Sequence, residues 1–300
     1  MEVEALRTFL TVHQRGTVTA AAPVLFRSQP AVTRRLAQLE REVGSPLFER
    51  VPSGLVLTRA GEALLPHAER VLAAVEDTEA ALRLQREEDA GPLPVAIVGT
   101  LAGAELTRAL RELAERHPHV DLRLRTATSS EVTALVRRGT ALLGLRYGAS
   151  PEPGLDFEYL FDERLVVVAA PDHPLAGAPV RGLAALSGER WLAFPFDAAR
   201  PETAAARVEH LLGAAGVDPT QVLRVDSLTA QKRLVEAGFG IAFLPQSGAA
   251  DEIAARTLVR LHVRGLDASQ PVVLVTRRGS DLGPAGRTLR DGLRALREPE

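Results

Sequence analysis

The stretch from Thr19 to Glu42 constrains the fold of this chain more than any other. Ser28, followed by Gln29 and Pro30, predicts a helix start, because a serine side chain can cap free backbone amides and proline fits the first helical turn. Apolar residues then recur at i, i+4 and i+7, which predicts one buried stripe along the helix: Val32, Leu36 and Leu39. We therefore expect an amphipathic helix from Ser28 onward.

A shorter helix of small residues, with Ala21, Ala22 and Leu25, precedes it. The joint Phe26–Ser28 is short enough for a helix–turn–helix. The second helix would then expose Gln29, Pro30, Thr33 and Arg34. Glutamine can bond adenine edges, proline or a threonine methyl can touch thymine, and arginine can read guanine or bind phosphate. The same spacing also suits an ordinary amphipathic helix whose polar face is only solvated.

The first sixty residues resemble, without a gap, the DNA-binding signature of the LysR-type transcriptional regulators. The resemblance rests on Leu6–Phe9, Gly16–Ala22, Ser28–Thr33, Leu39-Glu40, Gly44–Arg50 and Leu57–Gly61. Pro23 departs from it, because the family usually carries a helix-forming polar residue there. A proline at this point could kink the first helix without touching the exposed face.

A winged helix–turn–helix at residues 1–60, bound to double-stranded operator DNA, is what this resemblance implies. Two short strands around the turn Val51–Gly54, at Leu47–Arg50 and Leu55–Thr58, would form the wing. Arg50 could enter a minor groove or pair with phosphate, or it could be merely solvated. The expected DNA contacts are Ser28, Gln29, Pro30, Thr33, Arg34 and Arg50.

Charge is distributed unevenly along the chain, although the net charge is only −2. Residues 1–60 carry eight Arg against five Glu, or +3, and residues 61–90 carry three Arg against eight acids, or −5. A basic head beside an acidic stalk is the layout expected of a DNA reader. Of the 36 basic residues only Lys232 is a lysine, a bias typical of a GC-rich genome, and by itself it predicts no function.

A length of 300 residues favours two or three domains. The absence of cysteine excludes disulfides, thiolate metal sites and a thiol redox sensor. No apolar run reaches membrane-spanning length, and the N-terminus lacks a basic region followed by an apolar one. We therefore expect a cytoplasmic protein with no membrane partner.

Residues 61–89 predict one long helix, because the segment is rich in Ala, Leu and Glu. Apolar positions alternate in steps of four and three, which is a coiled-coil spacing: Leu64, Ala68, Val71, Val75, Thr78 and Leu82. The segment resembles the linker helix through which LysR-type proteins dimerise, and a homodimer or homotetramer is expected. Alternatively, the stripe docks on the chain's own domain.

Beyond Asp89–Pro92, apolar β-type runs alternate with amphipathic helices, which predicts an α/β fold with a parallel sheet. Leu155–Phe161 and Leu165–Ala170 read as separate strands. The region 92–297 resembles the LysR effector domain, which is similar to periplasmic binding proteins. That resemblance implies two lobes joined by two chain crossings, near Asp162-Glu163 and Gly265–Ser269. Lobe I would comprise about 92–161 and 269–297, and lobe II about 164–265.

Polar side chains follow several strands of this region, where α/β folds bind ligands. Hydroxyls at helix starts together with an arginine favour an anion such as a carboxylate, although each hydroxyl could be only a helix cap. The family commonly has an acidic residue where Leu142 stands, so this strand is more apolar than usual. The expected effector contacts are Thr100, Thr128, Ser129, Arg146, Tyr147, Phe194, Phe196 and Ser227.

No catalytic motif, metal site or cofactor fingerprint is recognisable, so we expect neither an enzyme nor a bound cofactor. His117-Pro118-His119 reads as the end of a helix before a strand. The chain is interpreted as a LysR-type regulator whose small-molecule effector binds between the lobes, with RNA polymerase as a further candidate partner. The alternative is a small-molecule-binding protein whose head serves assembly. The sequence does not reveal the effector, the operator, or whether transcription rises or falls.

Overall fold

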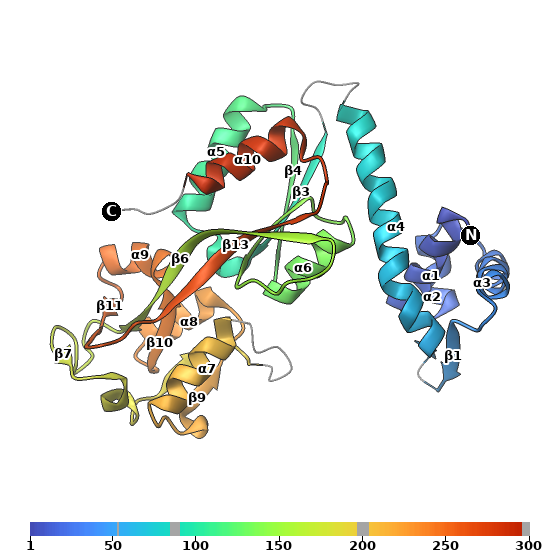
Figure 1. Cartoon of the computed structure of the whole chain (residues 1–300). Coiled ribbons are helices and arrows are strands. Elements are labelled where there is room, and N and C mark those ends of the chain that lie inside the picture. The colour runs from blue at the N-terminus through green and yellow to red at the C-terminus, as the bar shows by residue number, and fades with distance from the viewer. Residues whose placement is uncertain (53, 85–90, 197–203, 296–300) are drawn as a thin grey trace. The chain divides into compact units, whose positions relative to one another are not determined.

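The computed structural model describes residues 1–52, 54–84, 91–196 and 204–295 (Figure 1). The chain divides into two compact units: Met1–Glu87 with Arg137–Thr140, and Glu88–Val136 with Ala141–Glu300. Among the described residues, no helix combines the length and apolar character needed to cross a membrane.

Three helices, a two-stranded wing and one long helix make up the N-terminal unit. The predicted stripe of Val32, Leu36 and Leu39 is buried, and the wing strand brings Phe48 to 5.3 Å from Phe9, ring centroid to ring centroid. The helix–turn–helix and its antiparallel wing are therefore confirmed. The elements are α1 (Val3–Arg15), α2 (Val18–Val24), α3 (Gln29–Val43), β1 (Phe48–Val51), β2 (Gly54–Leu57) and α4 (Arg59–Leu84).

Helix ends in this unit follow the sequence with one exception. Thr17 caps α2, because its hydroxyl accepts the Ala20 N–H at 3.1 Å. Ser28 occupies the N-cap position of α3, but its side chain makes no capping hydrogen bond, so the predicted serine cap is wrong. The Ser28 carbonyl receives the Ala31 and Val32 amides instead. Pro23 lies in the last turn of α2, where little helix follows to be bent.

The long helix α4 uses part of its stripe within its own unit. Ala68 and Leu72 are buried in one hydrophobic cluster with α1 and α3, and Leu64 packs against that cluster. Val71, which lies between Ala68 and Leu72 in the sequence, is 41% exposed. The first turns of the stripe thus dock on the chain's own domain, as the alternative interpretation held. The Leu82 side chain and residues 85–89 of the predicted linker lie outside the described part.

Lobe I of the C-terminal unit is a sheet in the order β4-β3-β5-β13-β6 with helices on both faces (Figure 1). Strands β3, β4 and β5 are parallel, as predicted, but β13 runs antiparallel to β5 and β6, so the sheet is mixed. Its elements are β3 (Pro92–Val98), η1 (Gly99–Leu101), α5 (Ala104–Arg116), β4 (Asp121–Ala127), α6 (Ser129–Arg137), β5 (Leu143–Tyr147), β6 (Leu155–Ala169), β13 (Ser269–Arg277) and α10 (Gly283–Arg294).

Lobe II continues the sheet through β6-β10-β8-β9, with β11 on the other side of β6. Trp191 is fully buried there and stacks on Phe243 at 5.2 Å between ring centroids. Its elements are β7 (Pro179–Val180), η2 (Leu183–Leu186), β8 (Trp191–Ala193), α7 (Ala204–Ala214), η3 (Pro219–Gln221), β9 (Val222–Arg224), α8 (Leu228–Glu236), β10 (Ile241–Pro245), α9 (Gln246–Ala254), β11 (Val259–Arg260) and β12 (His262–Val263).

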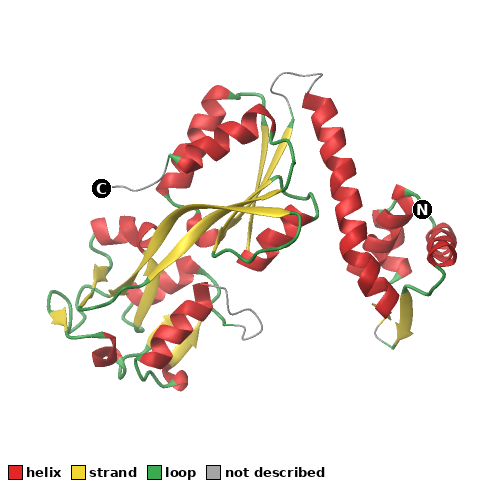
Figure 2. Ribbon diagram, viewed as in Figure 1, coloured by secondary structure: helices red, strands yellow, loops and turns green. Residues whose placement is uncertain are grey.

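One continuous strand, β6, joins the two lobes. The expectation of two separate strands at 155–161 and 165–170 is therefore wrong. Asp162 and Glu163 sit in the middle of β6, opposite Pro271 and Gln270 of β13. Figure 2 shows these two long strands running side by side through both halves of the unit. The pairing makes the double crossing a two-stranded ribbon rather than a pair of loose linkers.

Candidate functional site

The first turns of α3 present the polar residues that the sequence singled out. Ser28, Gln29, Pro30, Thr33 and Arg34 are all exposed. The Thr33 hydroxyl donates to the Gln29 carbonyl at 3.0 Å, so the side chain is held against its own helix. Arg34 forms no ion pair with any residue that the structure describes, which leaves its guanidinium available for a base or a phosphate.

The end of α3 holds the wing in place through Glu40. One carboxylate oxygen of Glu40 accepts the Leu47 N–H at 2.8 Å and the Phe48 N–H at 3.4 Å. These two amides begin the wing, and Arg50 lies exposed two residues later on β1. The Glu40 contacts therefore fix where the Arg50 backbone lies relative to α3.

Gly54 lets the tip of the wing approach the end of α1. Its φ is +133°, and a Cβ at this position would lie 2.6 Å from the Gly16 carbonyl oxygen. The same oxygen accepts the Leu55 N–H at 2.8 Å. A side chain at residue 54 would break this contact, which explains why the turn needs glycine.

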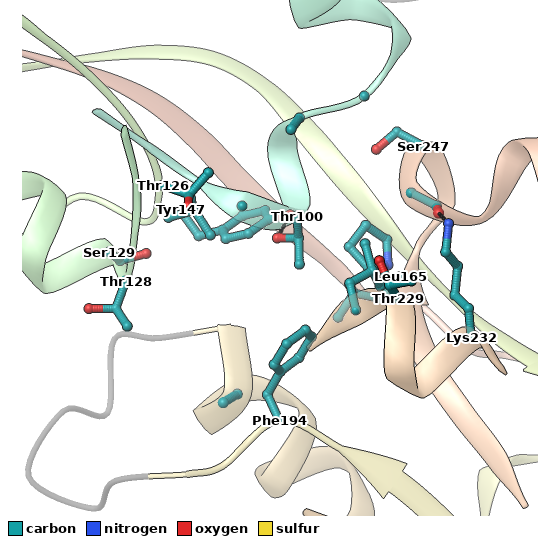
Figure 3. Close-up of a pocket in the computed structure, with 18 of the residues that line it drawn as sticks. Thr100, Thr126, Thr128, Ser129, Tyr147, Leu165, Phe194, Thr229, Lys232 and Ser247 are labelled. Carbon is teal, nitrogen blue, oxygen red and sulfur yellow. Dashed lines mark hydrogen bonds between the residues drawn. The ribbon is translucent and has the colours of Figure 1, made fainter. Parts of the chain in front are cut away.

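A cleft of about 1230 Å³ lies between the lobes, at the carboxyl ends of β3, β4 and β5 (Figure 3). The first turns of α5, α6, α8 and α9 all contribute to its lining. This is the place where an α/β fold binds its ligand. Predicted residues that line it are Thr100, Thr128, Ser129, Tyr147 and Phe194.

Hydroxyl groups dominate the lobe I wall. Thr100 Oγ1 and the Tyr147 hydroxyl are 3.0 Å apart and share a hydrogen bond. Burial raises the pKa of Tyr147, so this phenol stays protonated and keeps its hydrogen bond. Thr128 and Glu131 form a capping box: the Glu131 carboxylate accepts the Thr128 N–H at 2.8 Å. The Ser129 hydroxyl bonds to none of the described residues and borders the cleft.

Arg146 does not reach the cleft, contrary to the expectation from sequence. It is 1% exposed, its Nη1 donates to Thr133 Oγ1 at 2.6 Å, and its Nε donates to the Tyr147 carbonyl at 3.0 Å. The Phe157 ring centroid lies 6.0 Å from the guanidinium carbon. Successive residues of a strand point to opposite faces, so when Tyr147 faces the cleft Arg146 must face α6.

Two further predicted contacts also fall outside the cleft. Phe196 is 38% exposed and does not belong to the lining, whereas Phe194 and Pro195 do. Ser227 caps α8 by accepting the Ala230 N–H at 3.3 Å and likewise does not line the cleft. Leu142 packs against the lobe I core, away from the ligand space.

The structure adds lining residues that sequence reasoning missed: Thr126, Thr229, Lys232, Ser247 and Gly248. Ser247 and Gly248 belong to α9, a helix for which the sequence yielded no prediction. The sequence signal for α9 is Pro245, which ends strand β10, because proline is common at the start of a helix. The sequence predicts Glu163 only as part of a chain crossing between the lobes. Its carboxylate accepts the Ser247 amide at 3.1 Å and the Ser247 hydroxyl at 2.8 Å.

Comparison with known proteins assigns both units. Residues 3–62 match the family described as "Bacterial regulatory helix-turn-helix protein, lysR family", and residues 86–297 match "LysR substrate binding domain". The chain belongs to the LysR family of transcriptional regulators. Members of this family are DNA-binding regulators with an effector-binding domain and are not enzymes.

Full-length relatives of this LysR-type regulator cover nearly the whole chain. It is 31% identical to the transcriptional regulator CbbR of Rhodospirillum rubrum, over 95% of this chain and 93% of that one. It is 32% identical to the regulator YdcI of Escherichia coli K12, over 91% and 88% of the two chains. The solved structure of full-length CbnR with its target DNA is 27% identical with a TM-score of 0.64, covering 98% of this chain and 99% of that one.

Proposed function

We propose that this LysR-type regulator reads its operator with α3 and the wing, and that a small organic acid binds in the cleft and modulates that reading. In this proposal, residues 1–60 bind DNA, residues 61–89 mediate dimerisation, and residues 92–297 bind the effector. The observation that carries the cleft proposal is the convergence of open hydroxyls and four helix N-termini on one space between the lobes. The competing interpretation, a head used only for assembly, is set aside by the family match.

The proposed preference of the cleft for an acid rests on the residues that line it, and not on Arg146, which is buried outside it. Helix N-termini carry partial positive charge and bind anions. At two of the four helix N-termini, a carboxylate of the chain already accepts a backbone amide: Glu131 at α6 and Glu163 at α9. Ser129, in the first turn of α6, keeps an open hydroxyl, and Thr100 lies across from it on η1. A carboxylate oxygen bound by both would complete their hydrogen bonds.

Binding between the lobes can alter DNA reading only if the acid prefers one lobe arrangement over another. The two-stranded ribbon of β6 and β13 is the element about which such a change would turn. In a homodimer or homotetramer, a change of lobe angle would shift the spacing of the heads, because each helix–turn–helix reads only a half-site.

Titration of the full chain with butyrate, followed by calorimetry, tests the site. Loss of one hydrogen bond to a charged group weakens binding by about 10-fold or more, so Ser129→Ala should bind butyrate that much more weakly than wild type. Ser187→Ala, a serine of lobe II outside the cleft, is the matched control and should bind normally. Equal butyrate affinity in Ser129→Ala, or no binding to wild type, would contradict the proposed acid site.

A further inference from the structure

Lys232 is the one lysine among the chain's 36 lysine and arginine side chains, and the other 35 are arginine. The structure places this residue on α8, where it lines the cleft from lobe II. Figure 3 shows it on the wall opposite Thr128 and Ser129. The chain's single lysine therefore lies in the space where a ligand is expected.

The Lys232 ammonium is held by two protein acceptors. It donates to the Gly248 carbonyl at 3.0 Å and to Glu252 Oε1 at 2.6 Å, and its side chain is 18% exposed. An ammonium has three N–H donors. Among the residues described, no third protein acceptor is bonded to it. One of its three N–H donors is thus left without an acceptor among the described residues.

The ion pair with Glu252 does not by itself explain why residue 232 is a lysine and not an arginine. The second oxygen of Glu252, Oε2, is buried and has no hydrogen-bond partner among the described residues. The planar fork of an arginine could bond both carboxylate oxygens at once, whereas an ammonium reaches only one. A residue selected only to neutralise Glu252 would more naturally be arginine, the basic residue used everywhere else in this chain.

We propose that Lys232 binds a second anionic group of the effector, across the cleft from the group that Ser129 binds. This inference rests on the proposed acid site and narrows its ligand to a small acid with two anionic ends. Such a ligand would span the cleft from the Ser129 hydroxyl to the Lys232 ammonium, both of which line it. The second end can be a carboxylate or a phosphate-like group, because both accept from an ammonium.

Three acids with main chains of four atoms test the contribution of each end of such a ligand to binding. Butyrate carries one carboxylate, succinate carries two, and 3-phosphonopropionate replaces the second carboxylate with a phosphonate. Each is titrated calorimetrically into the full chain. Wild type should bind succinate or 3-phosphonopropionate about 10- to 100-fold more tightly than butyrate, the ratio expected for one added charged hydrogen bond. Which of the two binds more tightly identifies the second group.

Variants at residue 232 test the lysine itself. Lys232→Met combined with Glu252→Gln removes both charges, so no unpaired carboxylate is left buried, and it should bind all three acids with the affinity of butyrate. Lys232→Arg keeps a positive charge and N–H donors that a carboxylate or phosphonate accepts, so it should retain the preference. Arg233→Met, on the exposed face of the same helix, is the control and should retain it.

Each result bears on a different claim. Equal binding of butyrate and succinate to wild type, with Ser129→Ala still weakening both, would overturn the role of Lys232 and leave the acid site standing. Retention of the succinate preference in the Lys232→Met, Glu252→Gln variant would likewise overturn it, because the preference would then not depend on the charge at residue 232. Binding of none of the three acids to wild type would overturn the acid site and this inference together.

Discussion

Arg146 and Tyr147 are neighbours in sequence with opposite environments. Tyr147 lines the cleft and shares a hydrogen bond with Thr100, whereas Arg146 is buried against Thr133 on the far face of the sheet. The pleat of β5 puts these two neighbours on opposite faces of the sheet. Positively charged groups do line the cleft, but they are Arg108 and Arg111 of α5 and Lys232 of lobe II.

At the same scale, the exposed face of α3 yields a prediction about DNA. Gln29→Ala combined with Arg34→Ala should weaken binding to the DNA upstream of the protein's own gene, because each lost base contact costs about 1–3 kcal/mol. Folding should be unchanged, since both side chains are exposed. Gel-shift titration measures the affinity, and a circular dichroism melt measures the fold.

Gln38→Ala combined with Arg41→Ala is the matched control for that experiment. It removes the same two residue types from exposed positions further along the same helix. The control should bind the DNA nearly as wild type does. If the double variant at 29 and 34 protects the DNA with wild-type affinity, the reading face is placed wrongly.

Among the elements, α4 has an apolar stripe whose early positions pack within its own unit and whose later positions are more exposed. Its early positions, Leu64 and Ala68, pack with α1 and α3 in the head's own core. Val71 is 41% exposed, Val75 is half-buried, and Thr78 is exposed, so this part of the stripe has little covering within its own unit. Exposed apolar positions at coiled-coil spacing favour packing against a second copy of the same helix.

The dimer prediction therefore concentrates on the later turns of α4. Val71→Asp combined with Val75→Asp should convert the full chain to a monomer, because two carboxylates would be buried in the helix pair without partners. Sedimentation equilibrium measures the mass. Ala63→Asp, exposed on the same helix but off the stripe, should leave assembly intact. A dimer that persists in the double variant would place the interface elsewhere.

For the molecule as a whole, the β6–β13 ribbon is the connection through which the lobes act on each other. Glu163 lies on this ribbon, is 6% exposed, and bonds to Ser247 of α9 through both carboxylate oxygens. Burial, followed by the negative charge of Glu105, raises its pKa above the ordinary value, although the hydrogen bonds from Ser247 oppose the rise. The crossing thus contains a carboxylate that the fold makes costly to ionise.

A stability measurement against pH follows from that pKa. A carboxyl whose folded pKa is raised binds its proton more tightly in the folded state, so its contribution to stability falls as pH rises from the unfolded pKa, about 4.5, through the folded value. Each unit of elevation corresponds to about 1.4 kcal/mol. Glu163→Gln cannot ionise, so over this window the variant should gain stability relative to wild type as pH increases.

Trp191 provides the readout for that comparison. It is the chain's single tryptophan, it is fully buried in lobe II, and its Nε1 donates to the Leu186 carbonyl at 3.1 Å. Urea unfolding followed by its fluorescence therefore reports on the C-terminal unit in the full chain. A stability difference between Glu163→Gln and wild type that stays constant with pH would show that Glu163 does not titrate in this window.

Local patterns in the sequence were enough to predict the helix–turn–helix, the wing and most elements of the two lobes. Helix spacing, the Ser28–Pro30 start and the Val51–Gly54 turn act over a few residues, so they can be recognised without knowing the rest of the molecule. The same holds for Thr100 and Ser129, because both follow the carboxyl end of a strand, and the segments there border the ligand space of an α/β fold.

Tertiary structure decided what depends on two distant segments meeting. Whether 155–161 and 165–170 are one strand depends on the partner strand β13, which is more than a hundred residues away. Lys232 and Ser247 reach the cleft only because β6 and β13 bring lobe II against lobe I. Arg146 lies outside the cleft, on the face of the sheet that α6 covers. The face that a strand residue occupies depends on what packs against the sheet and not on the residue's own charge.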